Sequence, residues 1–365
     1  MPKKLPVVRD VERLPPLYDG WMKELLRGGI PRETKATCGT CPMVDGDRGY
    51  RADTKCCTYH PRLPNFLVGS ALADAATEAH MQQALRTQVH LVSPLGLLVP
   101  RDYLALYGVS TEAFGRARAL RCPHYDEGVA PGEAGSTGGC SIWRHRNAVC
   151  STYFCAHDRP LPADEFWTAA RDLLGALEES LSVWALLEVG FPSESLERAL
   201  SFEAKKKNDV PGGAPLHAHD HDRTVSDELT SFWRGWDDAP EALYRETYEL
   251  VSGLGLDEAL ALLGIQGRFR SQRLQQRYGD LLRRAVPPTC SVAEMKFEST
   301  SAKTVTIFAE AHPETLEVPN SVIQALALFR QGNVKVALDE LRDRGTPMEP
   351  ALLQELFDYG ILRKN

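Results

Sequence analysis

The fold of this chain depends on the stretch Cys140-Ser-Ile-Trp-Arg-His-Arg-Asn-Ala-Val-Cys150-Ser-Thr-Tyr-Phe-Cys155. A segment rich in glycine precedes it, and Cys122-Pro-His-Tyr stands before that segment. A segment so rich in glycine and proline, here residues 128–139, does not form regular secondary structure. We therefore expect these cysteines to lie in an irregular, loop-rich domain that spans residues 36–160.

A second cysteine group lies upstream. It reads Cys38-Gly-Thr-Cys41 and then, after fourteen other residues, Cys56-Cys57. Eight of the nine cysteines thus fall between residues 38 and 155, and Cys290 alone lies elsewhere. Cysteine also packs well in apolar cores, and we expect this role for Cys290 only.

The amino-terminal sequence bears on whether these cysteines form disulfides or bind metal. The chain begins MPKKLPVVRDVERLPPLYDGW, where no apolar run follows the lysines, so we expect no signal peptide. Its apolar stretches are too short to span a bilayer, and the net charge of −7 does not favour a polybasic membrane anchor. We expect a soluble cytoplasmic protein with no membrane partner. Because cytosolic thiols stay reduced, the cysteines are expected to bind metal.

The spacing of the cysteines supports metal binding. A Cys-x-x-Cys turn places two thiolates on one side of a tight loop, where both can reach one ion. Two such groups allow either two four-thiolate sites or one composite site, and we expect the groups to converge. The expected ligands are Cys38, Cys41, Cys56, Cys57, Cys122, Cys140, Cys150 and Cys155.

The second group resembles the YkgJ-type cysteine-cluster proteins, which are described as zinc- or iron-chelating domains. Their pattern includes a cysteine with a following acidic residue, matched by Cys122 and Asp126, and then C-S-I-Y-x-x-R-P-x-x-C, matched from Cys140 to Cys150. The first group departs from the family's CxxCC, and Asn147 replaces the proline. A more distant similarity is to flagellin lysine methylases, which carry a comparable cysteine arrangement with an iron–sulfur cluster.

The metal is expected to be an iron–sulfur cluster, with zinc as the alternative, since thiolates suit both. Zinc requires four ligands around one ion, and adjacent cysteines such as Cys56 and Cys57 are expected to project apart. A cluster separates its irons in space and accepts irregular spacing. His124 and His157 are the candidate non-cysteine ligands.

The rest of the chain is predicted to be mainly α-helical. A helix is expected over Asn65–His90, and an apolar stripe from Phe166 to Leu187 predicts a long helix. Strands Glu294–Ser299 and Thr304–Ala309 should form a β-hairpin, and three short helices should follow before a final strand. This last pattern predicts a small α+β module like a winged helix.

These patterns divide the chain into four parts. We expect an amino-terminal arm at 1–35, the cysteine-rich metal-binding domain at 36–160, and a helical domain at 161–290. The helical domain contains a linker at 205–225, and the hairpin with the winged-helix-like module occupies 291–365.

Two other features are weaker candidates for function. The alternating histidines His217, His219 and His221 resemble a metal-binding string, but they lie in the Gly/Pro linker and are expected to form a mobile loop. The basic stretch Arg268–Arg284 is expected to be a solvated helix face. The last helix carries Glu349, Glu355 and Asp358 without a basic residue, so nucleic acid is not an expected partner.

The expected function is that of a metal-binding protein with a redox or cluster-dependent role in modifying a partner protein. The alternatives are a zinc-stabilised protein-interaction module and a redox-sensing regulator. No nucleophile or acid/base constellation identifies a reaction, so the sequence does not decide whether the protein is an enzyme.

Overall fold

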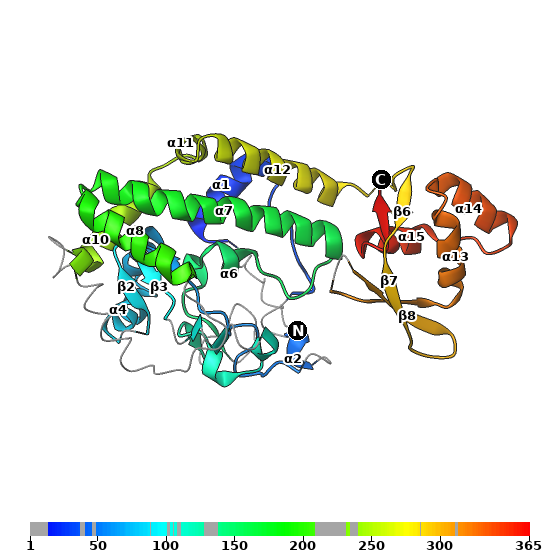
Figure 1. Cartoon of the computed structure of the whole chain (residues 1–365), viewed down its shortest axis with the longest axis horizontal. Coiled ribbons are helices and arrows are strands. Elements are labelled where there is room, and N and C mark those ends of the chain that lie inside the picture. The colour runs from blue at the N-terminus through cyan, green and yellow to red at the C-terminus, as the bar shows by residue number, and fades with distance from the viewer. Residues whose placement is uncertain are drawn as a thin grey trace, which may run out of the picture. The chain divides into compact units, whose positions relative to one another are not determined.

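The computed structural model describes residues 14–36, 41–45, 49–87, 89–100, 103–104, 106–107, 111–127, 138–208, 231–233, 240–284, 286–310 and 313–365. The chain forms two compact units. The first unit comprises Met1–Pro31, Ala36–Cys155 and Ala170–Ser271, and the second comprises Arg32–Lys35, Ala156–Ala169 and Gln272–Asn365. Helices predominate and the sheets are small, so the prediction of a mainly α fold is confirmed at this level (Figure 1).

In its described ranges, the first unit combines helices with two small antiparallel sheets. One sheet has the order β1-β3-β2, and the other pairs β4 with β5. Its strands are β1 (Leu63–Pro64), β2 (Leu91–Ser93), β3 (Gly96–Leu98), β4 (Tyr125–Asp126) and β5 (Gly139–Cys140). Its helices are α1 (Pro16–Leu26), α2 (Pro42–Asp45), α3 (Asn65–Ala73), α4 (Glu78–Arg86), α6 (Ala148–Thr152), α8 (Ser193–Asn208), α10 (Pro240–Ser252) and α11 (Leu256–Leu262), with short 3-10 turns η1 (Thr111–Ala113), η2 (Arg118–Leu120), η3 (Trp143–His145) and η4 (Ser231–Trp233).

Close packing of α3 against α10 forms the centre of this unit. Gly69 on α3 permits the contact, because a Cβ at this position would lie 1.8 Å from the carbonyl oxygen of Tyr244. Tyr244 is fully buried, and its hydroxyl donates a 2.7 Å hydrogen bond to the carbonyl of Ser93 in β2. The surrounding core draws apolar side chains from residues 63–98 and from 186–244. Segments far apart in the sequence therefore share one core.

The predicted single helix over Asn65–His90 is wrong, since the structure has α3 and α4 with a break between them. Asp74 ends α3 in an extended conformation, with ψ at 114°. Its carboxylate accepts a 3.0 Å hydrogen bond from the backbone N–H of Ala76, a local turn that competes with helix. The same carboxylate lies 3.2 Å from Nε2 of His145, so the break also anchors the loop that carries the later cysteines.

The long helix predicted from the apolar stripe is α7 (Pro160–Glu188), which contributes residues to both units. Phe166, Leu173 and Leu181 are fully buried, as their spacing predicts, whereas Leu187 at the end of the stripe is 52% exposed. A second long helix, α12 (Ile265–Leu282), runs beside it: Arg270 donates a 3.1 Å hydrogen bond to the carbonyl of Asp172. No helix in the described ranges has the length and apolar character needed to cross a membrane.

The second unit has its own core and confirms the predicted hairpin. β7 (Met295–Ser299) pairs with β8 (Thr304–Ala309), and β8 also pairs with β9 (Leu316–Pro319), in both cases antiparallel. β6 (Cys290–Val292) pairs with the final strand β10 (Leu362–Lys364). The three predicted helices are α13 (Ser321–Phe329), α14 (Val334–Asp343) and α15 (Pro350–Asp358).

Cys290 lies in the core of this second unit. Its side chain is 1% exposed, and its thiol lies 3.8 Å from the carbonyl oxygen of Phe329. This position is that of a buried apolar cysteine, as expected from its isolation in the sequence.

Candidate metal centre

Seven of the eight expected cysteine ligands lie in described residues, and all seven belong to the first unit. Cys38 lies outside the described residues, as do His217, His219 and His221. The seven are Cys41 directly before α2, Cys56 and Cys57 in the turn at 52–58, Cys122 after η2, Cys140 at the end of β5, Cys150 in α6, and Cys155 shortly after α6.

Backbone contacts bring the two cysteine groups together. The N–H of Cys122 donates a 2.8 Å hydrogen bond to the carbonyl of Cys57. Nζ of Lys55, a buried residue with a positive φ of 50°, donates to the carbonyl of Gly138 at 3.1 Å. The loop of the first group is thus tied at two points to the segments that carry the second group.

A pair of short strands places Cys140 next to Cys122. The N–H of Tyr125 donates to the carbonyl of Cys122 at 3.0 Å, which forms a tight turn. Tyr125 then pairs with Cys140 across β4 and β5. The hydroxyl of Tyr125 reaches back to the carbonyl of Ala52 at 3.3 Å, so this hairpin also contacts the loop of the first group.

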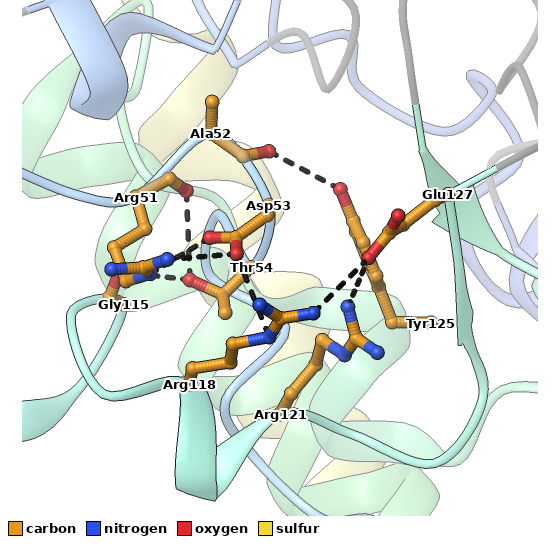
Figure 2. Close-up of polar contacts among 9 residues, drawn as sticks. All are labelled: Arg51, Ala52, Asp53, Thr54, Gly115, Arg118, Arg121, Tyr125 and Glu127. Atoms are coloured by element: carbon orange, nitrogen blue, oxygen red, sulfur yellow. Dashed lines mark hydrogen bonds and ion pairs between the residues drawn. The ribbon is translucent and has the colours of Figure 1, made fainter.

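Charged side chains hold the loop that leads into Cys56 (Figure 2). Arg51 donates two 2.8 Å hydrogen bonds to the carboxylate of Asp53, and Arg118 lies 3.8 Å from the same carboxylate. The hydroxyl of Thr54 donates to the carbonyl of Gly115 at 3.0 Å. Ion pairs this exposed contribute little to stability because solvent screens them, so their role here is to fix the path of the loop.

The thiols of the two groups interact with one another. A hydrogen bond between the thiols of Cys56 and Cys57, followed by burial, raises the pKa of Cys56 well above its usual value. The expectation that these adjacent side chains project apart is therefore wrong. Burial also raises the pKa of Cys122 and of Cys150, and the nearby Cys140 contributes to both. These thiols are protonated in the absence of metal, and metal binding must release their protons.

Arg146 places a buried positive charge at this cluster of thiols. Its Nε donates to the carbonyl of Trp143 at 3.0 Å, and Nη1 donates to the carbonyl of Cys150 at 3.1 Å. The guanidinium carbon lies 3.5 Å from the centre of the Trp143 ring, a cation–π contact. The guanidinium only partly opposes the rise in the pKa of Cys56, which is due first to the hydrogen bond with Cys57, and the rise in the pKa of Cys150, which is due first to burial.

A buried carboxylate lies behind α6. Glu178 of α7 accepts hydrogen bonds from the hydroxyl of Tyr18 and from the backbone N–H of Ala148, both at 2.5 Å. Burial raises the pKa of Glu178 to about 7, although both hydrogen bonds lower it. Asn147 caps α6 by accepting a 2.9 Å hydrogen bond from the N–H of Cys150. The cysteine of α6 is thus positioned by polar groups that its spacing in the sequence does not reveal.

A cluster of histidines includes His124, which follows Cys122 by two residues. His124 is buried, and its two ring nitrogens lie 3.0 Å from Nε2 of His80 and 3.0 Å from Nε2 of His90. Burial, with smaller effects of His80 and His60, lowers the pKa of His124 to about 3, so this imidazole is neutral near pH 7. No sequence pattern links these histidines, because each comes from a different segment.

His157, the other candidate histidine ligand, belongs to the second unit. Its Nδ1 lies 3.6 Å from a carboxylate oxygen of the buried Glu33, and its backbone N–H donates to Glu314 at 3.1 Å. These partners give His157 a structural role within the second unit.

The donor chemistry of the cysteine cluster fits a thiophilic metal or an iron–sulfur cluster, because thiolate is the preferred ligand of both. Among the described side chains, no three or more His, Cys, Asp or Glu residues are arranged to hold a single metal ion. The set of ligands, Cys155 included, therefore stays a prediction. Comparisons with protein-family models, with curated proteins and with solved structures found no match to this chain.

Proposed function

We propose that the first unit binds an iron–sulfur cluster through its cysteines, and that the protein uses this cluster in a redox or protein-modifying role. The observation that carries the proposal is the hydrogen bond from Cys122 to Cys57, which joins the two cysteine groups in one place. Thiolates are the usual protein ligands of such clusters. The resemblance of the second group to the YkgJ-type pattern points to the same chemistry.

The way in which the thiols are linked favours a cluster. A hydrogen bond links the thiols of Cys56 and Cys57, and the charge of Cys56 also affects the pKa values of Cys41 and Cys150, as that of Cys140 affects the pKa of Cys150. One zinc ion takes four ligands at about 2.3 Å. A cluster has several irons separated in space, and it can bind thiolates that are spread over a wider volume.

The role in modifying a partner protein rests on the distant similarity to flagellin lysine methylases. We propose that the winged-helix-like module at 291–365 contributes to binding of a protein partner. The charge of Asp358 in α15 is paired with Arg159 through hydrogen bonds of 2.7–3.1 Å, so the negative charge of this end of the module comes from Glu349 and Glu355. Negative charge on this helix disfavours nucleic acid as the partner.

Metal analysis of anaerobically purified protein tests the proposal directly. We expect a brown protein that contains iron and acid-labile sulfide. A colourless protein that contains zinc and no iron would overturn the proposal. That result would support the zinc-stabilised protein-interaction module instead. A cluster that changes with oxidants but modifies no partner protein would indicate the redox-sensing regulator.

A further inference from the structure

We propose that Arg146 tunes the reduction potential of the centre by holding a fixed positive charge beside its thiolates. This inference rests on the proposed iron–sulfur function and goes beyond it, because it assigns a role to a residue that is not a ligand. Arg146 is 8% exposed and lies in the sequence between Cys140 and Cys150.

The position of the charge is fixed by three contacts. The guanidinium lies over the Trp143 ring, and its hydrogen bonds to the carbonyls of Trp143 and Cys150 define its orientation. The backbone of Arg146 is held as well, because its carbonyl accepts a 3.2 Å hydrogen bond from the hydroxyl of Ser151. A charge held in this way cannot move away when the charge of its surroundings changes.

The charge of Arg146 affects the reduced and the oxidised states of a cluster differently. In reduction, one electron passes from an external low-potential donor to the cluster, no bond to the protein breaks, and the cluster gains one negative charge. A fixed positive charge in a poorly solvated site stabilises the reduced state more than the oxidised state. Arg146 should therefore raise the reduction potential.

Arg144 offers a matched control two residues away. Its side chain is 51% exposed and lies 3.7 Å from the carboxylate of Asp74. Solvent and the neighbouring carboxylate screen its charge. An effect of loop sequence or of overall charge would alter both arginine variants alike, whereas a specific effect of the buried charge would alter only the Arg146 variant.

The experiment is a redox titration of the full-length protein, followed by its visible and paramagnetic signals, with dithionite as the reductant. We expect Arg146→Gln to have a more negative midpoint potential than the unaltered protein. Arg146→Lys should restore most of the shift because it keeps the charge, and Arg144→Gln should leave the potential unchanged. Equal potentials for Arg146→Gln and the unaltered protein would overturn the inference.

A second variant keeps the test decisive if Arg146→Gln does not retain its cluster. Arg146→Met also removes the charge while its apolar side chain can still pack on the Trp143 ring, so the same negative shift is expected. A potential equal to that of the unaltered protein would then overturn the inference. The iron and sulfide content of each protein is measured first. If the unaltered protein contains zinc alone, both the proposed function and this inference are overturned. If it contains an iron–sulfur cluster whose reduction potential does not change in the Arg146 variants, only the inference is overturned.

Discussion

The backbone N–H of Cys122 lies 2.8 Å from the carbonyl oxygen of Cys57, although the two residues are far apart in the sequence. This contact fixes the loop of the first cysteine group against the second. A hydrogen bond between backbone groups also survives substitution of either thiol. Variants of single cysteines can therefore test metal binding without removing this link between the groups.

The first prediction concerns the packing of α3 on α10. Gly69→Ala should lower the free energy of unfolding by about 3 kcal/mol, because the added Cβ meets the backbone carbonyl of Tyr244, which cannot rotate away. Urea denaturation followed by circular dichroism measures the change. Gly20→Ala is the control: no atom lies within 4 Å of the position that its added methyl group would take, so it should be neutral or stabilising by up to about 1 kcal/mol. Equal effects of the two substitutions would contradict this account of the core.

The second prediction concerns pH. Burial raises the pKa of Glu178 from 4.5 to about 7, so the folded state binds this proton more tightly than the unfolded state does. Its stabilisation is complete below about pH 4.5 and is lost as the pH rises to about 7, a change of about 3 kcal/mol. Glu178→Gln stays neutral and can still accept the hydrogen bond from Ala148. The variant should be more stable than the unaltered protein at pH 8, and the difference should shrink as the pH falls from about 7 to about 4.5.

Thermal unfolding across this pH range measures the difference. Glu188→Gln, at the exposed end of α7, is the control for removal of one negative charge from this helix. A difference between Glu178→Gln and the unaltered protein that is constant from pH 4 to pH 8 would contradict the assignment of a buried, protonated carboxyl.

The third prediction concerns stability of the first unit. If thiolates gather around metal only in the folded state, metal binding adds to the folding free energy. Cys150→Ser should then make the first unit sensitive to protease, including the segments 186–202 and 243–252, whose buried side chains belong to its core. The second unit has a separate core and should resist cleavage. Chelation of the unaltered protein should reproduce the pattern, and a variant as resistant as its parent would show that the metal does not stabilise the fold.

Local patterns in the sequence predicted much of the fold. The stripe that includes Phe166 and Leu181 predicted α7, and alternation predicted the pairing of β7 with β8. The break at Asp74 was not predicted, because a side-chain hydrogen bond outweighed helical periodicity there. Local sequence patterns also do not predict the packing of α3 on α10, because Gly69 and Tyr244 are far apart in the sequence.

The candidate site was predictable only in its residue types. Clustered cysteines in two groups indicated metal binding, and the structure places Cys57 beside Cys122. The stacking of Arg146 on Trp143 and the carboxylate of Glu178 near α6 were not predictable. The spacing of cysteines in the sequence indicates which candidate ligands share a loop. The side chains that surround these cysteines come from distant segments, so local spacing does not indicate them.

Iron content of two matched cysteine variants tests the central claim most directly. Cys122 and Cys290 are both buried, but only Cys122 belongs to the cysteine cluster of the first unit. Iron and acid-labile sulfide per chain are measured after anaerobic purification of Cys122→Ser, Cys290→Ser and the unaltered protein. The proposed cluster predicts that Cys122→Ser loses most of its iron and sulfide while Cys290→Ser retains the full content. Equal iron and sulfide in the two variants would contradict it.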